Sequence, residues 1–182
     1  MRELALHILD VARNGIEADA TRVEVAVWED HDADTLKFAV RDNGSGMDAE
    51  TIEKAMDPFY TTRSTRRLGL GLPLLRATCR RCGGDLEIIS APGEGTEVQG
   101  TLELSHLDRP PLGDMGAVVQ SLACEAQRAS FSYEHSVDGR QFSVDTSEVI
   151  EQVGKDSLTN PSVLHWLGKF VRDGVEAAGS HA

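Results

Sequence analysis

The sequence predicts an α+β fold, a two-layer α/β sandwich in which helices cover one face of an antiparallel sheet. Two segments, 22–28 and 35–41, alternate apolar with polar residues, as half-buried strands do, and a short polar turn joins them into a hairpin. A second such pair, 85–90 and 96–104, follows later in the chain. Helical patterns precede both pairs, so the order of elements itself predicts this class.

Three helices should cover the sheet. The second begins at the N-cap residue Asp48 and ends at Met56. The third has Pro73 in its first turn, where no amide donor is needed, and Gly83 ends it. The first spans 3–18, because its apolar residues recur along one stripe: Leu4, Ile8, Ala12 and Ile16.

The chain should divide into two parts, a first unit of residues 1–105 and a small C-terminal α/β extension of residues 106–182. Asp108-Arg-Pro-Pro reads as a stiff linker between them. The expected elements of the extension are a helix at 113–127, a hairpin of strands 129–134 and 140–144, and helices at 146–153 and 161–177. The extension carries no chemical motif, and its role is open.

The charge balance excludes whole classes of partner. The 182 residues hold 18 Lys and Arg against 30 Asp and Glu, a net charge of −12. Such a chain repels nucleic acid and anionic membranes, so we expect neither as a partner. The start of the chain lacks an apolar signal region, no run of 18 apolar residues occurs, and three cysteines make no disulfide framework. We therefore expect a cytosolic, cytoplasmic protein.

One cationic segment interrupts this acidic background. Residues 63–81 hold six arginines and no acid, which indicates either an anion site or a solvated helix face. Gly69 and Gly71 open a helix within it, and amides at such a positive helix end are free for phosphate. Arg63, Arg66 and Arg67 add charge next to them.

Two acidic motifs complete the pattern. Asp10 and Asn14 share one helix face, and oxygen ligands there suit a hard cation, although such residues are usually solvated. Asp42-Asn-Gly-Ser-Gly46 follows a strand; its carboxylate can accept a hydrogen bond from an exocyclic amine such as that of adenine, and its glycines allow a flat ligand to approach. A tight turn is the alternative reading.

The order of these segments resembles the ATP-binding domain of the GHKL superfamily (the Bergerat fold), shared by DNA gyrase B, heat-shock protein 90, histidine kinases and MutL. The likeness covers about residues 4–104. Pro58-Phe-Tyr-Thr-Thr-Arg63, Gly69-Leu-Gly-Leu72 and Ser90-Ala-Pro-Gly-Glu-Gly-Thr96 resemble sensor histidine kinases. Asn14-Gly-Ile-Glu-Ala-Asp-Ala-Thr is closer to the N box of MutL.

The resemblance implies a role for each matching residue. Asn14 would hold Mg²⁺, Asp42 would take the adenine amine, and Asp10 would stand where hydrolysing members place a water-activating glutamate. Aspartate is one methylene shorter, and Arg67 replaces a glycine usual in the kinases. The remaining residues implied at the ATP site are Gly44, Gly46, Phe59, Thr62, Arg63, Gly69, Leu70, Gly71, Leu72 and Thr96.

Three functions are compatible with these features. The first is a stand-alone Mg-ATP-binding protein of the histidine kinase type, which hydrolyses ATP or transfers phosphate to a separate partner protein or phosphoacceptor in signal transduction. The others are a nucleotide-gated binding module without turnover and a MutL-like ATPase. Members of this superfamily often dimerise, and a homodimer is compatible with the sequence, which shows no interface that requires one.

Several features are expected to be structural. His106 lies in a stretch that resembles a kinase H box but follows the ATP domain, so we expect a linker that caps the next helix. Cys79 and Cys82 have redox spacing without the βαβ context of a redox motif. Cys124 is expected in the core. Trp166 and Phe170 either pack against the hairpin or face a partner.

Overall fold

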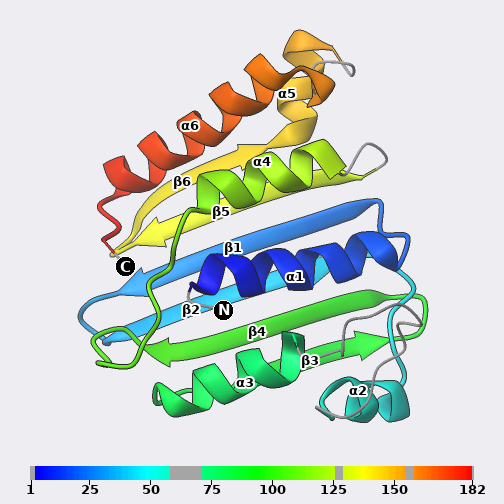
Figure 1. Cartoon of the computed structure of the whole chain (residues 1–182), viewed down its shortest axis with the longest axis vertical. Helices are drawn as coiled ribbons and strands as arrows, with labels where there is room; N and C mark the ends of the chain where they lie inside the picture. Colours follow the sequence, from blue (N-terminus) through cyan, green and yellow to red (C-terminus); the bar gives the residue numbers. More distant parts are fainter. Residues whose placement is uncertain (1–2, 58–70, 126–128, 155–157, 182) are drawn as a thin grey trace.

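The computed structural model describes residues 3–57, 71–125, 129–154 and 158–181. Helices and strands alternate along it much as the sequence indicated (Figure 1). Their bounds are α1 Leu4–Glu17, β1 Arg22–Asp30, β2 Thr35–Asp42, α2 Ala49–Ala55, α3 Gly71–Arg81, β3 Leu86–Ala91, β4 Gly95–Glu103, α4 Met115–Glu125, β5 Ser130–Val137, β6 Arg140–Asp145, α5 Thr146–Val153 and α6 Pro161–Ala178.

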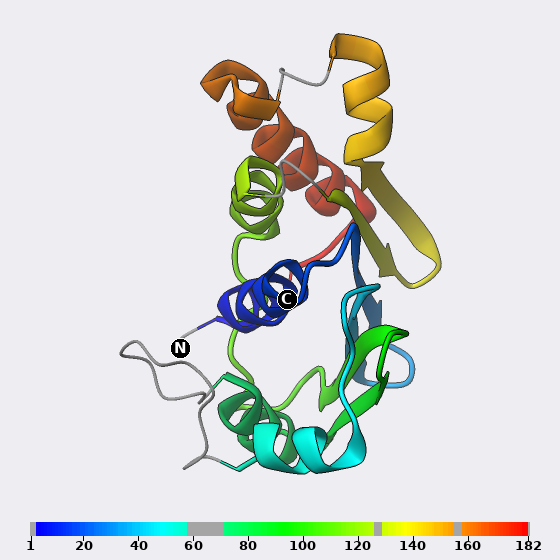
Figure 2. The same ribbon diagram turned by 90° about the vertical axis from the view of Figure 1, so that its right-hand side faces the viewer.

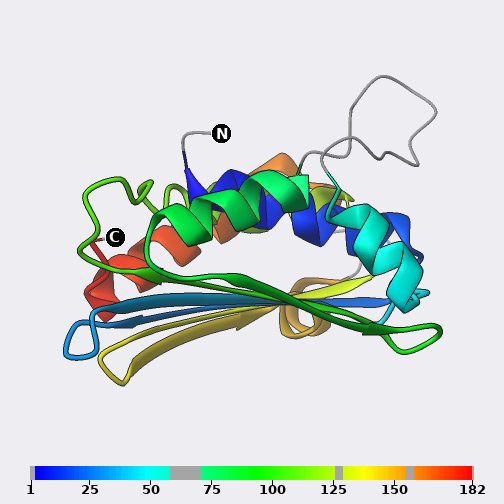
Figure 3. The same cartoon turned by 90° about the horizontal axis from the view of Figure 1, so that it is seen from below.

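All of these strands form one six-stranded sheet in the order β3-β4-β2-β1-β5-β6. Helices α1, α3, α4 and α6 lie over one of its faces (Figure 3), while α2 and α5 lie at opposite edges (Figures 1 and 2). The fold is therefore the two-layer α/β sandwich that the sequence predicts. Helix α1 runs across the middle of the sheet and positions the site described below.

The four strands of residues 22–103 pair antiparallel, as the sequence predicts. The C-terminal hairpin, which was expected in a separate extension, joins the same sheet through a parallel pairing of β5 with β1, so the whole sheet is mixed. Alternation along a strand tells which residues face the core, but it does not tell which strand edge will be its neighbour. The sheet runs without a break across residue 105, and the division into two domains there stays a prediction.

The core lies between the sheet and the helices. The inward residues of β1 are Val23, Val25 and Val27, each buried almost completely, and β2 adds Phe38 beside them. Burying a side chain of this size contributes roughly 1.5–3 kcal/mol to stability. The apolar stripe of α1 packs on these residues, with Ile16 only partly buried at its end. The alternation seen in the sequence therefore fixes which face of the sheet the helices cover.

The linker after β4 caps the start of α1. The backbone amides of Leu4 and Ala5 donate to the carbonyls of Pro111 and Leu112 over 3.0 and 2.7 Å. The first amides of a helix have no partner within the helix, so these bonds satisfy two of them. The linker thus caps α1, whereas the sequence led us to expect a cap on the following helix.

Three side-chain expectations have mixed outcomes. Cys79 and Cys82 are buried free thiols, and burial raises the pKa of Cys79 to about 12, which keeps it inert. Cys124 is exposed, so its expected place in the core is wrong.

Trp166 is 51% exposed and stacks on Phe170 with ring centroids 5.4 Å apart, while Phe170 also contacts Phe142 of β6. Phe170 therefore packs against the hairpin from the rim of the molecule.

Within the described residues, every helix is too short or too polar to cross a bilayer.

A buried polar chain joins β1, β5 and the end of the molecule. His135 Nε2 lies 2.7 Å from Glu29 Oε1, and the Tyr133 hydroxyl lies 2.6 Å from His135 Nδ1. Ser180 donates to the same oxygen of Glu29 over 2.5 Å. Burial raises the pKa of Glu29, but the hydrogen bonds from His135 and Ser180 outweigh it and leave the pKa below its ordinary value. The residues after α6 are thereby anchored to the sheet.

Replacing the histidine of this chain should destabilise the fold in a pH-dependent way. His135→Phe leaves the buried Glu29 carboxylate without its main donor, so thermal and urea unfolding at pH 7 should show a loss of about 3–5 kcal/mol. Because the folded pKa of Glu29 is lowered, its stabilisation is present above pH 4.5 and is lost as the pH falls further, so the two curves should converge in acid.

The matched control is His31→Phe, which breaks an exposed pair with Asp138 over 3.0 Å and should cost less than about 1 kcal/mol. Equal losses in the free energy of unfolding for the two variants would contradict a stabilising role for the buried hydrogen bonds of Glu29 and His135.

Candidate functional site

Asp42 ends β2 at the point where α1, β4 and the following loop meet. Its backbone lies opposite Thr96 of β4 and Val23 of β1. Its Oδ1 accepts from the amide of Gly44 over 2.8 Å. Burial raises the pKa of this carboxyl, and hydrogen bonds from the backbone of Gly44 and Thr96 offset part of that rise. A half-buried carboxylate held this way is an oriented acceptor.

Gly15 of α1 makes the room that Asp42 needs. An added Cβ at Gly15 would lie 2.7 Å from Asp42 Cβ and 3.0 Å from Asp42 Oδ2. Sequence reasoning did not assign this residue a role. The signal was present, because glycine inside a helix costs roughly 1 kcal/mol relative to alanine and such a cost calls for a packing reason.

The glycine loop 42–46 packs on the turn between β3 and β4. Gly95 has a φ of +84°, and an added Cβ there would lie 2.0 Å from the carbonyl oxygen of Asp42, so only glycine fits. Ser90 bridges the two segments: its hydroxyl accepts from the amide of Met47 over 2.8 Å and donates to the carbonyl of Gly95. The Thr96 hydroxyl lies 3.0 Å from the same Ser90 oxygen. Ser90 is a second residue that sequence reasoning missed.

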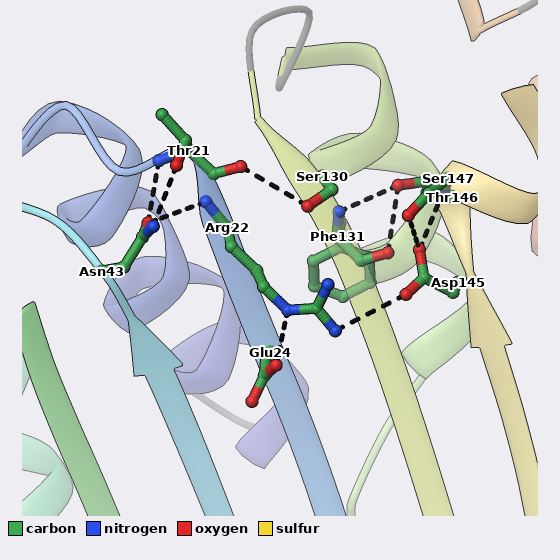
Figure 4. Close-up of polar contacts among 9 residues, drawn as sticks. All are labelled: Thr21, Arg22, Glu24, Asn43, Ser130, Phe131, Asp145, Thr146 and Ser147. Atoms are coloured by element: carbon green, nitrogen blue, oxygen red, sulfur yellow. Dashed lines mark hydrogen bonds and ion pairs between the residues drawn. The ribbon is translucent and has the colours of Figure 1, made fainter.

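Asn43 braces the loop from the other side (Figure 4). Its Oδ1 accepts from the amides of Thr21 and Arg22 over 2.9 and 2.8 Å, and its Nδ2 donates to the Thr21 hydroxyl. These three bonds tie the residue next to Asp42 to the start of β1. The side chain of Asn43 therefore fixes the loop, while that of Asp42 faces α1.

The same corner reaches into the C-terminal segment (Figure 4). Thr21 accepts from the amide of Ser130 over 2.9 Å, and the Arg22 guanidinium lies 2.6 Å from Glu24 and 3.6 Å from Asp145. Asp145 in turn caps α5 by accepting from the amide of Ser147. Polar contacts thus run without interruption from the loop beside Asp42 to the first turn of α5.

Helix α1 carries the other predicted polar residues. Asp10 and Asn14 are both half-buried and lie four residues apart on one helix face, and the Asp10 carboxylate lies against Gly71 at the start of α3. Gly71 and Leu72 form that start, and Leu72 packs against the core. The structure therefore brings Asp10, Asn14, Asp42, Gly44, Gly46, Gly71, Leu72 and Thr96 to the region between α1, α3 and the ends of β2 and β4.

Part of the predicted site lies outside the described residues: Phe59, Thr62, Arg63, Arg67, Gly69 and Leu70. The described ranges hold no group of three or more His, Cys, Asp or Glu side chains placed to bind a metal ion. Any metal ion here would need ligands from its substrate and from water in addition to Asn14.

A hollow of about 370 Å³ lies on the opposite face of the sheet, between Trp28, Arg41 and Glu148. Its walls include Arg22, which is paired with acids, and it contains none of the predicted site residues. A phosphate-bearing ligand needs free amides or unpaired cations, so this hollow is a poor candidate for a nucleotide site.

Comparisons with known proteins agree with this geometry. The family model described as histidine kinase-, DNA gyrase B-, and HSP90-like ATPase matches residues 2–106, more than half of the chain. This range contains α1, β1 to β4, α2 and α3.

Several curated relatives are sensor kinases. The chain is similar to the sensor histidine kinase YxdK of Bacillus subtilis, 33% identical over 53% of this chain and 31% of the relative. It is 38% identical to the sensor protein kinase FleS of Pseudomonas aeruginosa over 49% of this chain and 22% of that protein. It is 29% identical to a putative sensor protein of Shewanella frigidimarina over 56% of this chain and 16% of that protein. The likeness thus spans less than a third of each relative.

Solved structures show the same fold. The Aquifex aeolicus MutL ATPase domain complexed with ADP aligns with a TM-score of 0.51 at 18% identity, over 85% of this chain and 68% of that one. The N-terminal domain of a DNA repair protein aligns with a TM-score of 0.56 at 16% identity, over 79% and 52%.

The ionised side chain of Asp42 should destabilise the folded state. Its pKa is raised in the folded protein, so the contribution of the neutral carboxyl to the free energy of unfolding is present below pH 3.8 and is lost as the pH rises through the folded pKa. Asp42→Asn keeps the shape and removes the charge, so its midpoint of thermal unfolding at pH 7 should exceed that of the parent, and the gain should shrink toward pH 4. A lower midpoint at pH 7 would show that the carboxylate is structural.

Proposed function

Because the chain belongs to the family of histidine kinase-, DNA gyrase B- and HSP90-like ATPases and carries an ATP-binding domain of this type, we propose that it binds Mg-ATP between α1, the loop 42–46 and the start of α3. We further propose that it works in the cytosol as a stand-alone regulator. In this role it hydrolyses ATP or transfers phosphate to a separate partner protein, as a monomer or a homodimer.

The observation that carries this proposal is the environment of Asp42. Its Oδ1 accepts from the amide of Gly44, and the missing side chain of Gly15 lets the carboxylate lie directly against α1. Adenine offers an exocyclic amine that donates hydrogen bonds, and an oriented carboxylate is its matching acceptor. The close backbone approach at Gly95 holds the start of β4 against the residues beside Asp42. In the proposed site the purine ring lies next to these residues.

The phosphate end of the site follows from α1 and α3. Asn14 offers an amide oxygen to Mg²⁺, and the first amides of α3 face phosphate oxygens at a positive helix end. Mg²⁺ would supply charge neutralisation on the phosphates. Asp10 is placed to orient or activate a nucleophile from the same helix face. The arginines of 63–67 lie outside the described residues, and their role follows from the resemblance alone.

A nucleotide-gated binding module without turnover is the second candidate. Arg13 of α1 is held by Glu125 of α4 through two contacts of 2.9 and 2.5 Å. Asn43 accepts from the amide of Thr21, whose carbonyl in turn accepts from the amide of Ser130 in β5. The helix with Asp10 and Asn14 is therefore tied directly to the C-terminal segment. Such ties would allow occupancy of the site to change the surface that a partner binds.

Nucleotide binding is tested by calorimetry with ADP in the presence of Mg²⁺. The parent should bind, Asp42→Asn should lose binding, and Gly15→Ala should weaken it at least tenfold because its methyl group displaces Asp42. Gly139→Ala is the control for a glycine-to-alanine change away from the site: its added Cβ meets nothing within 4 Å, and its φ of +82°, unlike the helical φ of Gly15, adds only local backbone strain in the turn between β5 and β6. Unchanged affinity in Gly15→Ala would contradict the assigned role of Asp42.

Turnover is tested with γ-labelled ATP and a cell lysate. Label on a second protein supports transfer, free phosphate supports hydrolysis, and either signal should fall at least a hundredfold in Asp10→Ala. Binding of ADP without either signal would favour the module. Absence of ADP binding in the parent would contradict both.

A further inference from the structure

We propose that Gly71 is a positioning residue for Asp10, and that the two form an interlock in which the Asp10 carboxylate competes with phosphate for the first turn of α3. This inference rests on the proposed function for its ligand, but its geometry is independent of that function.

The geometry is a single close contact between two helices. An added Cβ at Gly71 would lie 2.2 Å from Asp10 Oδ2 and 3.4 Å from Asp10 Cγ. Real Cβ atoms do not approach other atoms to 2.2 Å, so the carboxylate occupies the space that a side chain at Gly71 would fill. Apart from the chain neighbours of Gly71 and the backbone of α3 itself, no other described residue lies within 4 Å of that point.

The backbone of Gly71 does not itself require glycine. Its φ is outside the left-handed region, unlike that of Gly83 at the end of the same helix. Alanine is a better helix former than glycine, so α3 would accept it on conformational grounds. Among the contacts of the described residues, it is the one with Asp10 that requires glycine at position 71.

The electrostatics of this contact give it a consequence for binding. The first turn of a helix carries partial positive charge and attracts anions. Pro73 has no amide hydrogen, so the free donors of this turn are concentrated at Gly71 and Leu72. A carboxylate against Gly71 therefore stands next to the donors that a phosphate would use, and the two negative groups repel each other.

This arrangement gives Asp10 two effects of opposite sign. Its charge weakens nucleotide binding, while its position on the face of Asn14 serves the chemistry proposed above. Charges about 4 Å apart in water interact by about 1 kcal/mol, which corresponds to a change in affinity of about fivefold. ATP carries one more phosphate than ADP, so the effect should be larger for ATP.

The first test is a double-mutant cycle in thermal unfolding of the full chain. Gly71→Ala should lower the midpoint of the parent because it displaces Asp10. In an Asp10→Ala background the same change should leave the midpoint unchanged or raise it, because the obstacle is gone. An equal loss in both backgrounds would overturn the interlock.

The second test is titration with ADP and with ATP in EDTA, where the absence of metal prevents turnover. Asp10→Asn should bind ADP about fivefold more tightly than the parent and should tighten ATP more than ADP. Equal or weaker binding in Asp10→Asn would overturn the competition. Failure of the parent to bind either nucleotide would instead contradict the proposed function, and the unfolding cycle would still decide the geometry.

Discussion

The structure depends on the contact between Gly15 of α1 and Asp42 at the end of β2. Two backbone segments approach closely because glycine presents no side chain, and the carboxylate fills the resulting space at an energetic cost that raises its pKa. Gly44 and Gly95 complete the enclosure from the loop and from β4. In the proposed function this energetic cost is offset by the ligand that the carboxylate binds.

The C-terminal segment is built into the same framework. It contributes β5 and β6 to the sheet, and its linker caps α1. Three sets of polar contacts join it to residues 3–105: Arg13 with Glu125, Asn43 through Thr21 to Ser130, and Glu29 with His135 and Ser180. A partner that binds this segment would therefore act on helices and strands that also carry the proposed nucleotide site.

Much of the fold could be predicted from the sequence, because the alternation of apolar and polar residues in strands and the spacing of apolar residues in helices indicate which side chains are buried. The strands of both hairpins, the Asp48 cap and the stop at Gly83 follow from such local signals. The parallel β1–β5 pairing did not follow, because strand order depends on contacts between distant segments. In the site, Asp42 was predicted from its motif, whereas Gly15 and Ser90 were missed because their roles are defined by what lies against them in space.

The central claim is that the Asp42 carboxylate recognises an exocyclic amine. Adenine carries its exocyclic amine, a donor, at C6, where guanine carries a carbonyl oxygen that a carboxylate repels; the exocyclic amine of guanine is at C2 instead. Calorimetric titration of the full chain with ADP and GDP under identical conditions tests this most directly. We predict that ADP binds and that GDP binds at least a hundredfold more weakly. Equal affinity for the two, or a preference for GDP, would contradict the account.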